Sequence, residues 1–283
     1  GLAVVTVLVG TILAACIGVI TASVTLLTLI ALPPMVKRGY SKSLASGAVA
    51  AGGCLGILIP PSVMLVVYGP MAGISVGKLF FGAFGPGLLL AVSYITYIAV
   101  RSLIQPAVAP PVPPEERAVP FLEKTTRLLT VLVPPMVLIM SVLGVIFLGI
   151  AAVTEAAGIG ALAAMVLAVA YRRFSWRVLK EVTLTTMEIS GWVMLMAGMA
   201  FAFTGVFIGA GGGLIVKDLI LSTPGGAWGG FVVIMFLTFI LGFFIDWWGI
   251  VFIMVPIITP IVPELGFHPV WFAIMVCVNL QMA

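Results

Sequence analysis

Three glycines and two adjacent prolines interrupt an apolar stretch of the chain between Gly52 and Ser62. The sequence reads Gly-Gly-Cys-Leu-Gly-Ile-Leu-Ile-Pro-Pro-Ser. Glycine lowers helix propensity and the two prolines remove backbone donors, so a helix through this stretch must open. Opened backbone at membrane depth is tolerated only inside protein or beside a water-filled cavity, where its freed carbonyls can bind a cation. The stretch therefore predicts a cation site of the kind used in transport.

Hydroxyl side chains form a second group of candidate ligands, near the centre of the first apolar run. Hydroxyl and carbonyl oxygens are the ligands that hard cations prefer. We expect one site between three hydroxyls and the carbonyls of the break, made by Thr21, Ser23, Thr25, Gly53, Gly56 and Ile59. The alternative is that each hydroxyl only bonds back to a carbonyl one turn earlier, as serine and threonine often do in membrane helices.

Asp246 is the acid that lies within the hydrophobic core of a segment. A carboxylate at that depth is costly unless it is paired or hydrated, so we expect a functional role. It either binds a second cation directly or caps backbone donors at the tip of a hairpin. By analogy with the first break, Asn279 and Gln281 on the following helix are expected to face it, and Ser23, Ser62 and Asn279 are candidates for substrate binding.

Other residues have a structural and a functional interpretation. Glu155 either caps a helix start together with Thr154, or takes part in helix contacts or the substrate path. Trp247, Trp248 and Trp271 either line a substrate cavity or serve as interfacial anchors and packing residues. Cys16, Cys54 and Cys277 lack metal or redox spacing and are expected to be small buried fillers.

The composition predicts an all-α polytopic membrane protein. Apolar residues make up 63% of the chain and charged residues 8%, with a mean hydropathy of +1.33. The net charge of +4 is small, and the basic residues form short clusters between apolar runs, so nucleic acid is not an expected partner.

Two helical hairpins are expected to position the candidate ligands. The first has arms Ala3–Ile17 and Val24–Met35 and precedes the broken helix, Leu44–Ala72. The second, Trp228–Ile245 and Ile250–Val262 around Asp246, precedes another apolar run. The remaining expected elements are spans at Leu79–Val100, Leu128–Gly149, Ile150–Tyr171 and Ile189–Ile208, an interfacial segment at Trp176–Glu188, a glycine-rich loop at Ala210–Ala227 and a proline-rich linker at Gln105–Glu123. The expected domains are 1–78, 79–101, 102–126, 127–227 and 228–283.

The distribution of Lys and Arg gives an orientation. If each hairpin returns to its starting side, one side receives Lys78 and Lys217 and the other receives the remaining eleven basic residues. The richer side is then cytoplasmic, and the two hairpins open to opposite sides, as in an inverted repeat. The side on which each segment ends is the same whether a hairpin is re-entrant or makes two full crossings, so the charge distribution leaves both possible. The length of the arms and the polar tips favour re-entrance.

Several stretches together resemble the large membrane subunit of TRAP (tripartite ATP-independent periplasmic) transporters, of the DctM type. These are Leu32–Tyr40, Gly52–Ser62, Val67–Gly69, Thr154–Gly160 and Val278–Ala283. The resemblance implies an elevator-type, sodium-coupled importer of organic anions, often carboxylates, in a bacterial or archaeal inner membrane. It also implies Na⁺ as the bound cation, and a small membrane subunit and a periplasmic substrate-binding protein as partners. Full-length members have further scaffold helices before the region of Gly1 and a Thr-Pro-Pro motif after Ala283, so the chain is expected to be a fragment.

Other functions fit the residues less well. A sodium/anion symporter of similar design that needs no binding protein is the main alternative, and the motifs argue against it. An intramembrane enzyme is not expected, because one buried Asp and the lone His268 make neither an aspartyl dyad nor a zinc site. The Gly209–Gly213 run lacks the context of a phosphate loop, and the discontinuous helices suit alternating access better than a passive channel.

Overall fold

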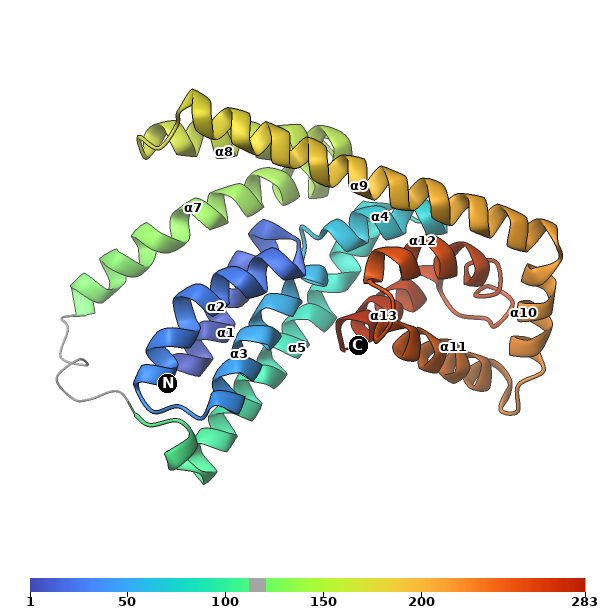
Figure 1. Cartoon of the computed structure of the whole chain (residues 1–283), viewed down its shortest axis with the longest axis horizontal. Coiled ribbons are helices and arrows are strands. Elements are labelled where there is room, and N and C mark those ends of the chain that lie inside the picture. Colours follow the sequence, from blue (N-terminus) through green and yellow to red (C-terminus); the bar gives the residue numbers. More distant parts are fainter. Residues whose placement is uncertain (112–120, 283) are drawn as a thin grey trace. The chain divides into compact units, whose positions relative to one another are not determined.

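The computed structural model describes residues 1–111 and 121–282, where helices are the regular elements (Figure 1). The α-helices are α1 (Leu2–Ile17), α2 (Ile20–Lys37), α3 (Lys42–Cys54), α4 (Val63–Ala72), α5 (Val76–Ile104), α7 (Phe121–Phe147), α8 (Val153–Ala170), α9 (Trp176–Gly209), α10 (Gly212–Leu221), α11 (Gly226–Gly242), α12 (Trp247–Ile258) and α13 (Pro269–Met282). The 3₁₀ turns are η1 (Leu55–Ile57) and η2 (Pro106–Val108). The prediction of an all-α protein is confirmed.

Close packing divides the chain into two units. Unit 1 contains Gly1–Val63 and Ala83–Leu167, and unit 2 contains Met64–Gly82 and Ala168–Ala283. The domains expected from the sequence follow the repeats rather than this packing, and their bounds stay predictions. Most of the charged part of the expected linker, residues 112–120, lies outside the described residues.

Five helices of the described ranges are long and apolar enough to cross a membrane. They are Ile20–Lys37, Val76–Ile104, Leu129–Phe147, Val153–Ala170 and Trp176–Gly209. The chain is therefore a multi-pass membrane protein. The apolar helices α1, α11 and α12 are shorter, with 16, 17 and 12 residues, which agrees with the expected hairpin arms. Because α2 has 18 residues, re-entrance of the first hairpin stays a prediction.

The first hairpin turns over two residues rather than over the longer tip expected at Gly18–Ser23. Gly18 adopts φ 67°, a left-handed conformation that favours glycine, and its N–H donates to the Ala14 carbonyl, which caps α1. The second arm then starts at Ile20 and continues through Pro33 and Pro34. The expected start at Val24 was wrong because a helix accommodates hydroxyl residues when they bond back to the preceding turn.

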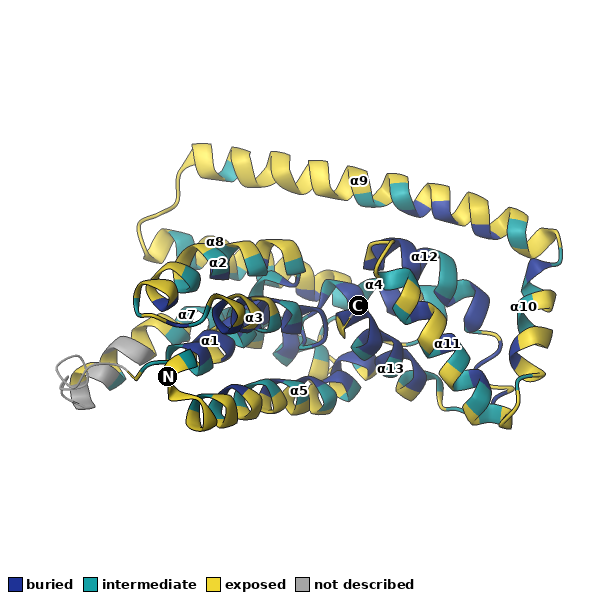
Figure 2. Ribbon diagram, turned by 60° about the horizontal axis from the view of Figure 1, so that its bottom comes forward, coloured by how far each residue is buried: buried dark blue, intermediate teal, exposed yellow. Residues whose placement is uncertain are grey.

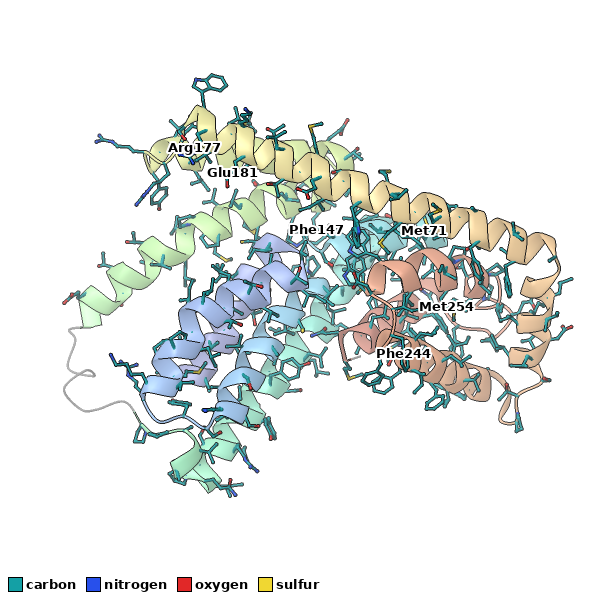
Figure 3. All side chains as sticks on the ribbon, viewed as in Figure 1. Met71, Phe147, Arg177, Glu181, Phe244 and Met254 are labelled. Atoms are coloured by element: carbon teal, nitrogen blue, oxygen red, sulfur yellow. The ribbon has the colours of Figure 1, made fainter. Side chains whose placement is uncertain are left out.

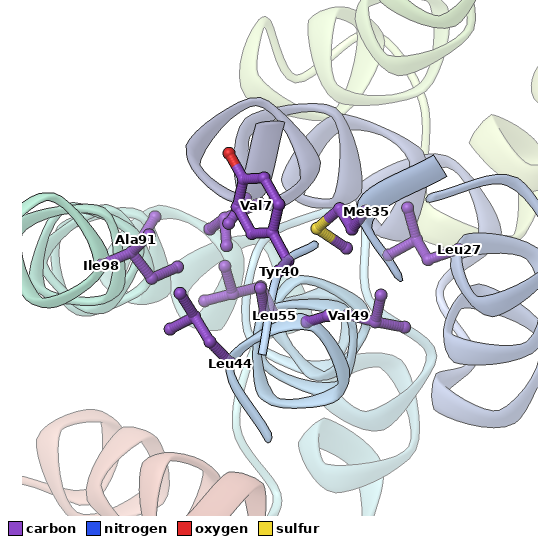
Figure 4. Close-up of a cluster of buried hydrophobic side chains, with 12 residues drawn as sticks. Val7, Leu27, Met35, Tyr40, Leu44, Val49, Leu55, Ala91 and Ile98 are labelled. Atoms are coloured by element: carbon purple, nitrogen blue, oxygen red, sulfur yellow. The ribbon is translucent and has the colours of Figure 1, made fainter. Parts of the chain in front are cut away.

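The core of unit 1 forms where α1, α2, α3 and α5 meet (Figure 4). Val7, Leu27, Met35, Tyr40 and Ile98 are buried in it. The Tyr40 hydroxyl also accepts a hydrogen bond from the Leu2 N–H at 3.0 Å, which satisfies one of the free donors at the start of α1. This cluster ties the hairpin to the broken helix.

The helix opens at the predicted place. After Cys54 the chain makes the 3₁₀ turn η1, passes through the cis peptide bond between Pro60 and Pro61, and enters α4 at Val63. The Ser41 side chain caps the start of α3 by accepting from the Leu44 N–H at 3.2 Å. The break predicted from glycine and proline is therefore confirmed.

Two elements of unit 2 differ from the sequence prediction. Trp176–Glu188 is not a separate interfacial segment but the first part of α9, because no glycine or proline interrupts the helix before Gly191. Leu214–Leu221 is not part of a loop, since α10 is a helix that starts at Gly212. Glycine content alone was a poor guide there, because glycine at a helix start costs little.

Helix α9 is the most exposed long helix of unit 2 (Figure 2). Its first turns carry Arg177 and Glu181 one turn apart (Figure 3), together with large exposed apolar side chains such as Val182 and Met187. Exposed apolar side chains on a helix that can cross a membrane are suited to contact with lipid or with another membrane helix.

Candidate functional site

The first hairpin and the broken helix approach each other backbone to backbone. A Cβ added to Gly10 of α1 would lie 3.1 Å from the Gly52 Cα, and one added to Gly56 would lie 2.6 Å from the Ala14 carbonyl oxygen. Gly10 and Ala14 on one side, and Gly52 and Gly56 on the other, each have the spacing small-x-x-x-small, which permits close helix packing in membranes. Sequence reasoning missed Gly10 and Ala14, although this spacing was a signal that could have identified them.

Ser23 is the candidate hydroxyl that is buried next to a residue in contact with the broken helix. It is fully buried on α2, and its Oγ donates to the Val19 carbonyl at 2.9 Å. The next residue, Val24, touches the break, because a Cβ on Gly53 would lie 2.9 Å from the Val24 amide nitrogen. The back-bonded alternative therefore describes this serine. A hydroxyl that donates its hydrogen still has lone pairs for a cation.

Thr21 and Thr25 lie elsewhere on α2. Both are exposed, and with Leu26 and Leu29 they line a wide, shallow hollow of about 430 Å³. The structure thus brings Ser23 to the break but places the two threonines on another face of the helix. The assignment of all three hydroxyls to one sodium site stays a prediction.

The residues of the break itself pack tightly. Gly53 and Gly56 are buried, and Ile59 is half-buried against Gly87 of α5, where an added Cβ would lie 2.8 Å from the Ile59 Cγ1. The Ile59 N–H donates to the Leu55 carbonyl at 2.9 Å. Ser62 is buried, and its hydroxyl donates to the Ile57 carbonyl across the break. The break is a defined, closed turn rather than a loose loop.

Asp246 begins the second arm of the second hairpin. Its side chain is exposed, and Oδ1 accepts a hydrogen bond from the Trp247 N–H at 2.9 Å at the start of α12. This is the capping geometry that the sequence left open as one of two roles. The described residues contain no hydrogen bond from Asp246 to Asn279 or Gln281.

Two amides of α13 have contrasting surroundings. Asn279 is buried and its Nδ2 donates to the Met235 carbonyl of α11 at 2.7 Å. Gln281 is also buried, but neither its Oε1 nor its Nε2 has a hydrogen-bond partner among the described residues. The Thr204 hydroxyl of α9 is in the same situation. Unpaired buried polar groups are rare and call for an explanation.

The remaining candidates make structural contacts among the described residues, without Thr154 taking part in the cap, and their roles in a substrate path stay predictions. Glu155 Oε2 accepts from the Ala152 N–H at 2.9 Å at the start of α8, as in a capping box. Trp247 and Trp248 are buried and stacked, with ring centroids 4.0 Å apart, and Trp271 packs on Phe231. These tryptophans are packing residues of unit 2.

The comparison with known families settles the membership of the chain. The family model of the tripartite ATP-independent periplasmic transporter, DctM component, matches residues 1–283. The chain belongs to this family. The resemblance inferred from the motifs is confirmed, and the DctM relatives are named as transporter permeases rather than enzymes.

Three relatives give the extent of the similarity to other DctM proteins. The C4-dicarboxylate TRAP transporter large permease protein DctM of Pseudomonas aeruginosa is 31% identical over 285 residues, covering 100% of this chain and 65% of that protein. Its counterpart of the same name in Rhodobacter capsulatus is 29% identical over 286 residues, covering 95% and 63%. The 2,3-diketo-L-gulonate TRAP transporter large permease protein YiaN of Escherichia coli is 26% identical over 284 residues, covering 100% and 65%. The chain thus spans just under two thirds of the length of these relatives.

Proposed function

We propose that this chain is the substrate-translocating part of a sodium-coupled importer of an organic anion in a bacterial or archaeal inner membrane. The match of residues 1–283 to the DctM family carries this proposal. The anion is delivered by a periplasmic binding protein, and a small membrane subunit completes the transporter. The discontinuous helix from α3 to α4 supports the proposal, because such breaks provide ion ligands in secondary transporters.

The proposed substrate class follows from the relatives. Two of these three relatives are named for C4-dicarboxylates and one for 2,3-diketo-L-gulonate, whereas others are named for isethionate or ectoine, and an organic carboxylate is the class that we propose. Ser23, Ser62 and Asn279 are the candidate substrate contacts. No membrane-depth Arg or Lys was evident in the sequence, so hydroxyls, helix starts and bound sodium would supply the attraction for the anion.

The first proposed sodium site lies between the start of α2 and the break. Ser23 brings a buried hydroxyl oxygen, Gly53 packs against the next residue, Val24, and Gly53, Gly56 and Ile59 would supply backbone carbonyls. Sodium asks for several oxygen ligands, and carbonyl-rich sites suit it. Thr21 and Thr25 belong to the proposed site only if the start of α2 rearranges when sodium binds.

The second proposed sodium site involves Asp246, Asn279 and Gln281. The two unpaired atoms of Gln281 support it, because a bound cation would satisfy Oε1. In Asn279 the Nδ2 donates to the Met235 carbonyl, so Oδ1 is the atom that would bind the cation. Asp246 caps α12 and would contribute charge rather than a contact formed in this structure.

The test is uptake by proteoliposomes that contain the permease and its small membrane subunit. Labelled succinate and a succinate-loaded periplasmic binding protein are supplied outside. We expect uptake under an inward sodium gradient and none when potassium replaces sodium. Equal uptake with either cation would refute sodium coupling, whereas uptake of free succinate without the binding protein would favour the symporter alternative.

A further inference from the structure

A cavity of about 610 Å³ lies within unit 1, between the first half of α3 and the last turns of α5. It is distinct from the break, which lies at the other end of α3. Its walls are mainly apolar and include Gly47, Ala48 and Ile98, and Tyr97 stands at its rim with a side chain that is 62% exposed. A volume of this size holds a ligand rather than a single water molecule.

One end of the cavity is polar and positive. Arg101, in the last turn of α5, lines it together with Ser41 and Ser43 at the start of α3. No carboxylate of the described residues lies within ion-pair distance of Arg101. The backbone N–H of Ser41 donates to the Val108 carbonyl at 2.9 Å, which holds the η2 turn against this end. The cavity therefore has a fixed basic mouth and an apolar body.

Further basic residues lie near the positive end of the cavity. Lys42 is the first residue of α3, and Lys37 is the last residue of α2, which packs beside α3. Both lysines lie on the Lys- and Arg-rich side that the positive-inside distribution assigns to the cytoplasm. A ligand that fits must combine an anionic head with an aliphatic body. In a multi-pass membrane protein, an anionic phospholipid of the adjacent leaflet meets that description.

We propose that this cavity is a binding site for an anionic phospholipid of the cytoplasmic leaflet. The phosphate lies against Arg101 and Ser43, and one acyl chain lies along Gly47, Ala48 and Ile98. A zwitterionic lipid carries its own cation beside the phosphate, which weakens the attraction of Arg101, so the site discriminates between head groups. The proposal requires that the chain spans a membrane with its Lys- and Arg-rich side in the cytoplasm, and its outcome is independent of sodium coupling.

The test measures phospholipid retained by the purified protein in native mass spectrometry, after exchange into detergent with phosphatidylglycerol or phosphatidylethanolamine. We expect phosphatidylglycerol to be retained preferentially. Arg101→Gln is expected to weaken its binding about fivefold, the value of one basic residue near an anionic lipid, whereas Arg101→Lys keeps most of it. Equal retention of the two lipids by the unmodified protein would overturn the proposal.

Filling the cavity gives an independent readout. A Cβ added to Gly47 meets no atom within 4 Å, so Gly47→Leu is expected to fold and to occupy the lipid path. Gly198 of α9 in unit 2 is an equally open and exposed helical glycine, and Gly198→Leu is the matched control. Only Gly47→Leu is expected to lose phosphatidylglycerol. Equal retention by both leucine variants would exclude this cavity as the site. If Gly47→Leu fails to fold, the comparison of Arg101→Gln with Arg101→Lys decides.

Discussion

Ser23 is the side chain on which the first proposed ion site depends most. Thr28, on the same helix, makes the same type of hydrogen bond to a carbonyl one turn earlier, with its Oγ1 2.7 Å from the Val24 oxygen. The difference between the two lies in their surroundings, because Ser23 is fully buried beside the break. Variants of these two residues can therefore distinguish an effect of the Ser23 hydroxyl on sodium binding from the effect of losing a hydrogen bond to the preceding turn.

Ser23→Ala is expected to raise the sodium concentration for half-maximal uptake about tenfold or more, the value of a lost contact to a charged group. Thr28→Val removes an equivalent back-bond and should leave sodium dependence unchanged. Thr21→Val and Thr25→Val then report whether the exposed hydroxyls join the site. Sodium titrations of uptake distinguish these cases, and equal behaviour of the Ser23 and Thr28 variants would contradict the role of Ser23.

Gln281 presents the opposite situation, a buried amide without a partner. In sodium-free protein, Gln281→Leu is expected to increase the free energy of unfolding by about 1–3 kcal/mol, because it removes an unsatisfied polar group. The same variant should lose the increase in melting temperature that sodium gives to the unmodified protein. A destabilised variant that still responds fully to sodium would contradict the second proposed site.

Asn279→Leu, at another residue of the same proposed site, is expected to have the opposite effect on stability. It breaks the hydrogen bond to Met235 and leaves that buried carbonyl unpaired, so the free energy of unfolding should decrease. The two substitutions on α13 are thus expected to change the free energy of unfolding in opposite directions. Thermal unfolding in detergent, with and without sodium, measures both.

At the scale of elements, the sequence predicted the features that depend on local chemistry. The break at Gly56–Pro61 followed from backbone propensity, and the cap at Glu155 followed from side-chain spacing. The division of Ser23 from Thr21 and Thr25 could not be predicted, because it depends on which face of α2 meets α3. The short turn at Gly18 was missed for a related reason, since helix packing extended α2 toward the turn.

Alanine substitutions of two glycines of α3 distinguish the effect of helix packing on stability from the effect of helix propensity. Gly53→Ala places a methyl group against the Val24 backbone and is expected to decrease the free energy of unfolding by about 1–3 kcal/mol. Gly47→Ala enters open space and should increase it by about 1 kcal/mol through helix propensity. Chemical denaturation in mixed micelles compares the two. Equal effects would mean that α3 does not pack on α2 through Gly53.

At the scale of the whole molecule, the orientation depends on charge and on α9. This helix has 34 residues, so it is about 51 Å long, whereas the apolar core of a bilayer is about 30 Å thick. Its charged first turns, with Arg177 and Glu181 (Figure 3), are therefore expected to extend out of the apolar core or to lie in the head-group layer. The basic residues Arg172 and Arg173 precede it, and Lys217 follows in α10.

Cysteine labelling tests this orientation. In a protein whose three native cysteines are replaced, Asp218→Cys should react with a membrane-impermeant maleimide in intact spheroplasts, because the distribution of Lys and Arg predicts that α10 lies on the periplasmic side. Arg173→Cys should react only after the membrane is permeabilised. Both positions are exposed, so accessibility within the fold is matched. The reverse pattern would invert the assignment of sides.

The backbone contacts of Gly10 with Gly52 and of Ala14 with Gly56 also limit which parts can move. No side chains lie between these segments that could rotate to let them separate, so parting them would open a void on both surfaces and lose dispersion contacts. We therefore expect that the tip beside Ser23 does not lift away from the break as a hinged gate. If an ion binds at Ser23 as proposed, its exchange between the two aqueous phases would require the hairpin and α3 to shift together as one rigid body.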